Sequence, residues 1–454
     1  MRDANGGGSR QKESRIGYAW YVVFVLMACY TLSFVDRQIL SLLVGPIKRD
    51  LQVSDTRIGL LQGLAFSLFY TFMGLPLGRM ADTHNRRNFI GVAVLIWSFF
   101  TASCSAAKSF WSLFLARIGV GVGEAGLSPA AYSLITDYFP KDRLGLALSV
   151  YSMGLFIGSS LALLVGGATV DALSHLPPVT APLLGTMASW RLTFLIVGAP
   201  GLLFALLVYT VREPVRQALL RNREGRPSKL NLRETFAQVR PRWQSVAGIS
   251  LGMIFQSTIT YGFQAWAPTF FIRVHGWTAG QAGRTLGTII LISGCLGMYV
   301  GGRLGDYWQK RGMSEAQLMV VVPSAIGAGI LFPLAMTAHS AEWTRILLFP
   351  AVFFQALPVA TVVAAIQLIV PNQLRGQMSA LFLFCLNLGG LSLGPLMPAI
   401  LSDYLFKNEK MIGLSLAITI GAAAILTLAV FVATFRPYRT HYRMMHSAEP
   451  VATH

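Results

Sequence analysis

Twelve apolar runs, each long enough to cross a lipid bilayer, divide this chain of 454 residues. A membrane-spanning helix needs about 20 mostly apolar residues. The chain is 54% hydrophobic and only 12% charged, against about 25% charged residues in soluble domains. The sequence therefore predicts an all-α membrane protein with transmembrane helices at residues 17–45, 56–81, 88–107, 109–139, 144–172, 189–211, 245–272, 281–308, 316–338, 344–370, 376–405 and 411–435.

The positive charges follow a topological pattern. The net charge is +18, which by itself would suit a nucleic-acid partner, but most Lys and Arg residues lie in the two tails and in the even-numbered loops. Positive residues stay on the cytoplasmic side of a membrane protein, and they also attract anionic lipid headgroups. We therefore expect both termini in the cytoplasm of a bacterial-type inner membrane, contacts with membrane lipids, and no nucleic-acid partner.

Two loops repeat the same pattern. The segment from Gly78 to Arg87 and the segment from Gly302 to Arg311 align without gaps at an offset of 224 residues, with Gly, Arg, Asp and a closing basic pair in register. Self-similarity at about half the chain length indicates two six-helix halves of common origin. We expect an N-terminal tail at 1–16, six-helix bundles at 17–211 and 244–436, a cytoplasmic linker at 212–243 and a cytoplasmic tail at 437–454.

Four charged residues lie deep within the predicted spans. A charge at the centre of a membrane helix costs about 2.5–3.5 kcal/mol on insertion scales, so such charges point to a function. Arg117 and Glu124 share one face of the fourth span, about 10 Å apart along the axis, and Asp36 and Arg37 are adjacent in the first span. Two structural alternatives stay open: Arg37 snorkels to the interface, or the charges form a purely structural ion pair between spans one and four.

Two short motifs resemble those of soluble enzymes but lie in a different context. Residues 121–126 fit the dinucleotide pattern G-x-G-x-x-G, and residues 248–252 fit the nucleophile pattern G-x-S-x-G. Both patterns need a strand, a turn and a helix, whereas small residues within a membrane span allow helices to approach closely. The four cysteines all fall in predicted spans without metal-ligand spacing. We expect no cofactor, no metal site and no catalytic residues.

The chain resembles the major facilitator superfamily over nearly its whole length. The resemblance rests on the six-plus-six arrangement, on the G-x-x-x-D-x-x-x-[KR]-[KR] loops after spans two and eight, and on the arginine of span four that glycines follow. Narrower features resemble the Spinster-like branch, namely Val35-Asp36-Arg37, Ile58-Gly59-Leu60-Leu61-Gln62 and Arg117-x-x-x-Gly121-x-Gly123-Glu124-Ala125. Members of that branch move lysophospholipids and sphingosine-1-phosphate-type lipids. For bacterial-type relatives with the same motifs, other organic anions stay open as substrates.

The resemblance implies roles for the deep charges. In the family, the span-one aspartate and the span-four glutamate are protonation sites and the span-four arginine is their switch. These residues correspond to Asp36, Glu124 and Arg117, and we expect Arg37, which follows Asp36 directly in the sequence, to take part in the same proton coupling. Burial favours the neutral form of a carboxylic acid, and a nearby positive charge favours the ionised form. An arginine that moves toward or away from one of these acids during a conformational change would therefore cause that acid to release or bind a proton.

Charged loops and neutral polar side chains complete the expected machinery. In the family the repeated loops act as gates, and the corresponding charged residues here are Asp82, Arg86, Arg87, Asp306, Lys310 and Arg311. Topology alone explains part of the basic residues, but it does not explain the two aspartates.

Polar side chains within the spans indicate a substrate cavity that contains Gln62, Gln256, Thr260, Tyr261, Gln264, Gln367 and Asn387. For each glutamine, a hydrogen bond to a neighbouring helix is the alternative.

Together these features predict a monomeric, proton-coupled secondary transporter that works by alternating access. Its expected substrate is an amphiphilic or anionic small molecule such as a lysophospholipid or a sphingoid-type lipid. An organic-anion or drug transporter of the same superfamily is the nearest alternative. A membrane-embedded lipid-modifying enzyme with Asp36 and Glu124 as its acid and base, and a non-transporting receptor, are alternatives from other classes. Product analysis would reveal the enzyme, and a pH-dependent flux would exclude the receptor.

Overall fold

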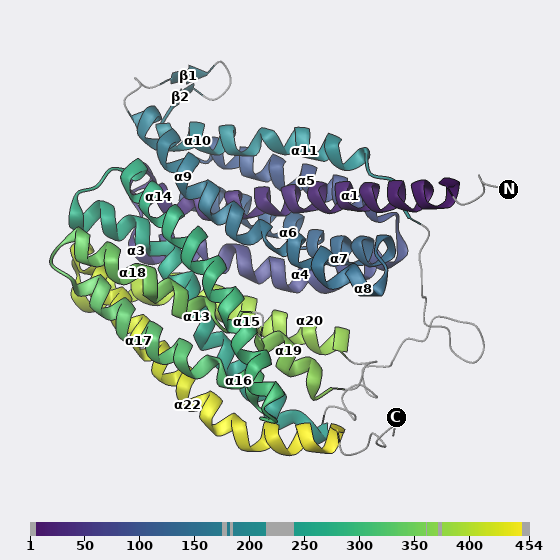
Figure 1. Ribbon diagram of the computed structural model, residues 1–454. Helices are drawn as coiled ribbons and strands as arrows, with labels where there is room; N and C mark the ends of the chain where they lie inside the picture. The colour runs from purple at the N-terminus through teal and green to yellow at the C-terminus, as the bar shows by residue number, and fades with distance from the viewer. Residues whose placement is uncertain are drawn as a thin grey trace. The chain divides into compact units, whose positions relative to one another are not determined.

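Long helices make up almost the whole of the computed structural model (Figure 1), which describes residues 6–174, 179–181, 185–214, 240–359, 361–370 and 375–446. In this part of the chain, eleven helical stretches are long and apolar enough to cross a membrane, and each covers one predicted run. The remaining run, 56–81, forms two consecutive helices, α3 (Asp55–Gln62) and α4 (Leu64–Thr83). The prediction of an all-α membrane protein with twelve spans is confirmed.

Packing divides the chain into two units. The first unit comprises residues 1–51 and 68–227, and the second comprises residues 52–67 and 228–454. The segment 52–67, which contains α3 and the start of α4, therefore belongs with the C-terminal half of the sequence. The predicted linker at 212–243 lies mostly outside the described residues.

The first unit is a bundle with one small hairpin. Helix α1 packs against α9, and α5 packs against both α6 and α11. The strands pair antiparallel with Val179 opposite Met187, between α9 and α10. Besides residues 68–83 of α4, its elements are α1 (Gly6–Gln38), η1 (Ile39–Leu42), α2 (Val44–Leu51), α5 (Arg86–Ser103), η2 (Cys104–Ala106), α6 (Phe110–Glu124), α7 (Leu127–Tyr138), α8 (Lys141–Ser152), α9 (Gly154–Ser174), β1 (Val179–Ala181), β2 (Gly185–Met187), α10 (Ser189–Gly198) and α11 (Pro200–Tyr209).

The second unit is a bundle in which α13 packs against α22 and α21, and α17 packs against α18 and α22 (Figure 1). Two of its spans contain π-helical turns: η4 lies in the span Ala279–Lys310, and η6 and η7 both lie in the span Leu381–Phe406. Besides α3, its elements are η3 (Arg240–Arg242), α13 (Trp243–His275), α14 (Ala279–Ile289), η4 (Ile290–Gly294), α15 (Cys295–Lys310), α16 (Ala316–Met319), α17 (Val321–Thr337), α18 (Ala341–Ala356), α19 (Thr361–Leu368), α20 (Arg375–Cys385), η6 (Leu386–Gly390), α21 (Leu391–Ile400), η7 (Leu401–Phe406), η8 (Glu409–Met411) and α22 (Ile412–His446).

Local sequence signals set several helix ends. Helix α6 begins with a capping box in which Ser109 and Ser112 exchange side-chain and backbone hydrogen bonds, and α14 begins with the equivalent exchange between Thr278 and Gln281. A capping box satisfies amide groups that have no partner within the helix. Helix α13 ends at Gly276, which has a φ of +68°, a left-handed conformation that glycine adopts without steric cost.

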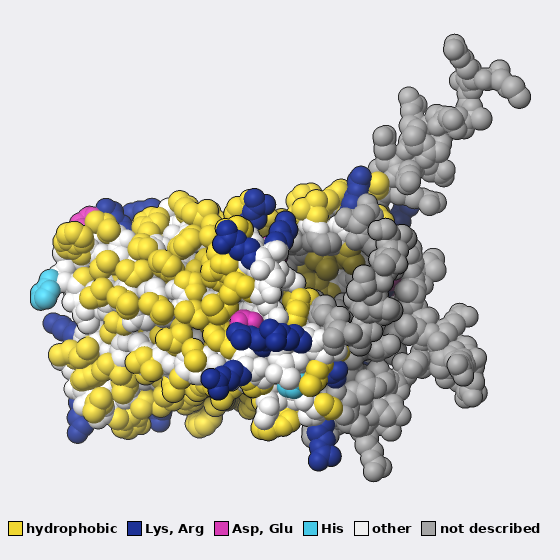
Figure 2. All heavy atoms as spheres, turned by 60° about the horizontal axis from the view of Figure 1, so that its bottom comes forward, with side chains coloured by type: hydrophobic (Ala, Val, Ile, Leu, Met, Phe, Trp, Pro, Cys, Tyr) yellow, Lys and Arg dark blue, Asp and Glu magenta, His cyan; other side chains and the backbone are white. Residues whose placement is uncertain are grey.

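Each unit has an apolar interior and an apolar outside. Trp97, Trp190 and Phe194 are fully buried in the first unit, and Trp266 and Phe263 are fully buried in the second. Many large hydrophobic side chains are also exposed, for example on α11 and α18. Figure 2 shows one face on which hydrophobic side chains cover most of the described surface. An apolar exterior of this extent suits contact with lipid rather than water.

Gly63, the residue between α3 and α4, packs closely against the start of α21. At Gly63 the backbone approaches the start of α21 so closely that an added Cβ would lie 2.7 Å from the carbonyl oxygen of Leu391. Glycine permits such an approach because it has no side chain. The hydropathy of the run 56–81 gave no indication of the break between α3 and α4.

Candidate functional site

A cluster of buried charges lies in the first unit, where α1 meets α6. The Nε atom of Arg37 donates a 2.6 Å hydrogen bond to Oε2 of Glu124. Ser33 Oγ donates a 2.5 Å hydrogen bond to the same oxygen. Ser33 and Arg37 are four residues apart on α1, and positions i and i+4 share one helical face. Glu124, the last residue of α6, is 1% exposed.

Two aromatic rings hold the guanidinium group of Arg37. Its central carbon lies 4.8 Å from the centroid of the Phe34 ring and 4.7 Å from that of Tyr70. A cation that is removed from water gains about 2 kcal/mol from such an aromatic face. The rings therefore stabilise a positive charge next to Glu124 and fix its direction.

Asp36 and Arg117 form the second part of the cluster. The Nη1 atom of Arg117 donates a 3.2 Å hydrogen bond to the main-chain oxygen of Asp36. The carboxylate of Asp36 instead faces α5, where Thr101 Oγ1 donates a 3.2 Å hydrogen bond to its Oδ2 atom. Asp36 and Arg117 are each 1% exposed. The four charges that the sequence singled out therefore meet at α1 and α6, and a residue of α5 completes the group.

Each of the two acids has one oxygen atom without a hydrogen bond. Oδ1 of Asp36 and Oε1 of Glu124 are buried and have no hydrogen-bond partner among the described residues. A buried polar atom without a partner is costly, so each of these oxygens is a position for an ordered water molecule, an ion or a functional proton.

The glycines around Glu124 allow close packing of α6 on α5. A Cβ atom at Gly123 would lie 2.7 Å from the main-chain nitrogen of Trp97. The motif G-x-G-x-x-G therefore lies at the end of α6 and in the two residues before α7, rather than in a strand–turn–helix unit. The interpretation as a helix-packing motif agrees with the structure, because only small residues permit this approach.

Arg86, a predicted gating residue, is the centre of a second charge network in the first unit. It is 1% exposed, and it donates to Asp137 at 2.5 Å, to Glu213 at 2.7 Å and to Ser133 at 2.8 Å. These bonds connect the start of α5 to α7 and to the segment after α11.

The other charged residues of this repeated loop do not share the hydrogen bonds described for the Arg86 side chain. The side chain of Arg87 donates to the adjacent Asn88, and its main-chain nitrogen donates to Glu213. Asp82 belongs to α4, but its side chain lies outside the described residues.

The corresponding loop of the second unit makes other contacts. Gln317 Nε2 donates to Asp306 at 3.4 Å and to Gln309 at 2.7 Å, and the guanidinium of Arg311 lies over the Tyr307 ring. Lys310 is the last residue of α15. Two loops with the same sequence pattern are therefore held by different partners.

Two of the predicted cavity residues connect helices of the second unit. Gln256 on α13 is 2% exposed, and its Nε2 donates to Ser324 Oγ at 3.1 Å and to the main-chain oxygen of Gln355 at 3.3 Å. Gln355 Nε2 in turn donates a 2.6 Å hydrogen bond to Thr260 Oγ1. Gln256 and Thr260 thus take part in a polar cluster among α13, α17 and α18.

The other predicted cavity residues are spread over the second unit. Gln62 Nε2 donates to the main-chain oxygen of Ala265 at 3.3 Å. Tyr261 and Gln264 are half-buried on α13, Asn387 is half-buried in η6, and Gln367 is exposed on α19.

The structure adds a buried ion pair that the sequence analysis did not single out. Asp55 at the start of α3 is fully buried and accepts hydrogen bonds of 2.7 and 2.8 Å from the two terminal nitrogens of Arg273 on α13. Asp403 caps α3 by accepting from the main-chain nitrogen of Thr56 at 2.6 Å. An acid directly after Ser54 is a recognisable helix-start signal, but nothing local indicates its partners.

Comparisons with known proteins identify the family of this chain. The family model described as Major Facilitator Superfamily matches residues 26–395. An MFS-type efflux pump of Mycolicibacterium smegmatis is 32% identical over 418 residues, which cover 89% of this chain and 90% of that protein. The hexuronate transporter of Bacillus subtilis is 24% identical and aligns with 84% of this chain and 87% of its own length.

Spinster proteins appear among both the sequence relatives and the solved structures. Protein spinster homolog 1 of Xenopus tropicalis is 25% identical over 86% of this chain and 74% of its own length. A crystal structure of a bacterial homologue of the human lysosomal transporter Spinster, in an inward-facing and unoccupied conformation, has a TM-score of 0.74. It is 26% identical and covers 96% of this chain and 99% of that one. The chain therefore belongs to the Major Facilitator Superfamily and resembles the Spinster proteins within it.

Proposed function

We propose that this protein is a proton-coupled secondary transporter that moves an amphiphilic or anionic organic molecule by alternating access. The single observation that carries the proposal is the buried bond from Arg37 to Glu124, next to an unpartnered oxygen of the same acid. We assign it to a monomer in the inner membrane with both termini in the cytoplasm.

The coupling mechanism follows from the contacts of the acids. Ionised Glu124 attracts Arg37 and so ties α6 to α1, whereas protonated Glu124 loses this charge attraction. Asp36 has Arg117 and Thr101 as neighbours. Buried ion pairs are poor stabilisers compared with apolar packing, which favours a functional role for this cluster over a structural one. Protonation of Glu124 would release the connection, and deprotonation would restore it.

The charge networks at the ends of the helices suit the role of gates. Arg86 with Asp137 and Glu213 connects three segments of the first unit. Asp55 with Arg273 and Asp403 holds α3 in the second unit. Ion pairs of this kind can break in one conformation and re-form in another. We therefore assign to both networks the role of stabilising one transport state over the other.

Two substrate classes have specific support. Arg37 and Arg117 provide positive charge, and the resemblance to Spinster proteins favours a lysophospholipid or a sphingoid-type lipid. The likeness to transporters named for hexuronate and L-galactonate favours an organic acid instead. Both classes carry an anionic group, and they differ in whether an apolar chain accompanies it.

The test is proton flux into proteoliposomes that contain the purified protein. The panel comprises lysophospholipids, sphingoid phosphates and sugar acids, each added with and without a pH gradient. We expect one class to evoke proton flux in the wild type and no flux in Glu124→Gln. Glu342→Gln is the matched control, because Glu342 is an acid whose side chain is 68% exposed.

The outcomes separate the alternatives. Flux evoked by sugar acids alone would establish the organic-acid transporter, and substrate uptake without proton movement would contradict the coupling. Chemical conversion of a lipid in the same vesicles would reveal a membrane-embedded enzyme.

A further inference from the structure

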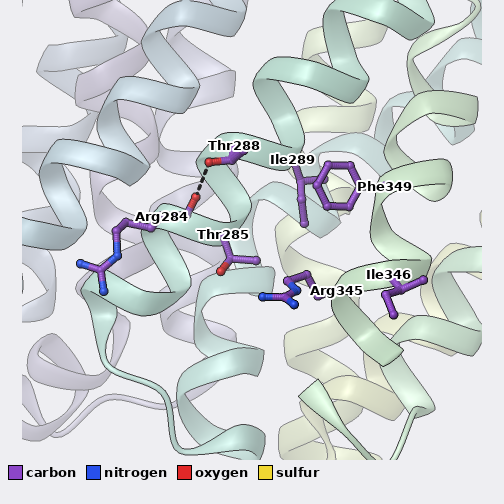
Figure 3. Close-up of a pocket in the computed structure, with 7 residues that line it drawn as sticks. All are labelled: Arg284, Thr285, Thr288, Ile289, Arg345, Ile346 and Phe349. Atoms are coloured by element: carbon purple, nitrogen blue, oxygen red, sulfur yellow. Dashed lines mark hydrogen bonds between the residues drawn. The ribbon is translucent and has the colours of Figure 1, made fainter. Parts of the chain in front are cut away.

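A surface pocket of about 500 Å³ lies in the second unit between α14 and α18 (Figure 3). It is open to the outside, and two arginines, two threonines and three apolar residues line it. The charge cluster of the first unit and the predicted cavity residues take no part in it. The pocket is therefore separate from the proposed coupling and substrate residues.

One end of the pocket is positively charged and carries hydroxyl groups. Figure 3 shows Arg345 extending from α18 toward Thr285 of α14, while Arg284 leaves α14 at the rim with its guanidinium directed outward. Arg284 has no ion-pair partner in the described part of the chain. Arg345 pairs with Glu342, but both side chains are largely exposed, at 46% and 68%. An exposed pair of this kind contributes little and opens readily, so both arginines are available to an anion.

The other end of the pocket is apolar. Ile289 and Phe349 lie next to each other in Figure 3, and Ile346 extends from the same helix as Phe349. Ile346 is 52% exposed and Phe349 is 36% exposed. A ligand that fills the whole pocket must therefore carry an anionic group at one end and an apolar chain at the other.

The position of the pocket along its helices matches the depth of a lipid headgroup. Arg284 is five residues after the start of α14, and Arg345 is four residues after the start of α18, which places both within about 8 Å of the helix ends. Trp343, two residues before Arg345 on α18, is 63% exposed, and tryptophan is enriched at membrane interfaces. Phe349 is one further turn along α18, on the side of the hydrocarbon.

The predicted topology places these helix starts on the side opposite the cytoplasm. The positive-inside rule disfavours arginine on that side. The presence of Arg284 and Arg345 therefore needs an explanation other than the orientation of the protein in the membrane. The phosphate group of a bilayer lipid supplies it, because the guanidinium fork of arginine matches the geometry of a phosphate.

We propose that this pocket binds an anionic phospholipid of the surrounding bilayer. Its phosphate accepts hydrogen bonds from Arg345 and from the hydroxyl group of Thr285, Arg284 adds positive charge at the rim, and one acyl chain runs along Ile346 and Phe349. The occupant is a lipid rather than free phosphate, because the apolar half of the pocket lies open beside the charged half. The inference is independent of the transported substrate.

Native mass spectrometry of the purified full chain tests the proposal. The protein is titrated with phosphatidylglycerol, and phosphatidylcholine serves as the zwitterionic comparison. We expect saturable binding of phosphatidylglycerol that weakens about tenfold or more in the double variant Arg284→Gln/Arg345→Gln, because that variant removes both positive charges that attract the phosphate. Phe349→Ser should weaken binding without a change of charge.

The matched control is Lys407→Gln/Lys410→Gln, which removes two exposed positive charges from another loop of the same unit. It should bind phosphatidylglycerol like the wild type. An equal loss in the control, or unchanged binding in the arginine variant, would overturn the proposal. Full competition by inorganic phosphate would also overturn it, because it would identify the site as one for a free anion.

Discussion

Arg37 and Glu124 are 87 positions apart in the chain, and their side chains meet in a hydrogen bond of 2.6 Å. Ser33, one turn earlier on α1, donates to the same oxygen of Glu124. Helices α1 and α6 are therefore connected by an acid that both a guanidinium and a hydroxyl group hold. In the proposed mechanism, the charge state of this acid sets how strongly the two helices are held together.

Glu124→Gln should fold and bind substrate but lose its response to a proton gradient. Glutamine keeps the shape of the side chain and cannot exchange a proton. The measurement is substrate flux at several external pH values, with Glu342→Gln as the exposed control. A Glu124→Gln variant with the pH profile of the wild type would remove this residue from the coupling mechanism.

Arg37→Gln should lower stability more than the double variant Arg37→Gln/Glu124→Gln. Removal of one partner leaves a buried charge uncompensated, at a cost of about 3–5 kcal/mol, whereas removal of both does not. Thermal unfolding in detergent of the two single variants, the double variant and the wild type gives the coupling energy. Additive effects of the two substitutions would contradict a direct interaction.

Arg86→Gln should destabilise the first unit and shift the balance between transport states, whereas Arg87→Gln should do neither strongly. Arg86 is buried with two carboxylate partners, and Arg87 donates to its neighbour Asn88. Cysteine probes at the two ends of the helices report accessibility in each variant. Identical labelling of both variants and the wild type would exclude Arg86 from the gate.

Asp55→Asn should destabilise the protein by about 3 kcal/mol or more, because Arg273 loses the buried carboxylate that it pairs with at 2.7 Å. Glu409→Gln is the matched control. Its carboxylate lies 3.8 Å from the same arginine and its side chain is 60% exposed, so the expected loss is below about 1 kcal/mol. The measurement is the unfolding temperature of the two variants. Equal shifts would show that the buried ion pair stabilises the protein no more than the exposed one does.

The sequence indicated the location of much of the candidate site but not its partners. The four deep charges stood out because charges are costly in apolar runs, and the structure brings them together at α1 and α6. Asp137, Glu213 and Asp55 were not singled out, since acids near span ends are common and their sequence neighbours do not show what they contact. Gln256 was expected to line a substrate cavity, and the structure shows it bonded to α17 and α18.

Hydropathy and the repeated loops by themselves determined that this chain is a twelve-span membrane protein of two related halves, because apolar length and internal repetition are local properties of a sequence. The tertiary structure alone decided that Glu124 bonds to Arg37, that Arg117 bonds to the main chain of Asp36, and that residues 52–67 belong with the second unit. These relationships depend on how each helix is rotated and how closely its neighbours approach. Such rotation and approach result from packing between residues that are far apart in the chain.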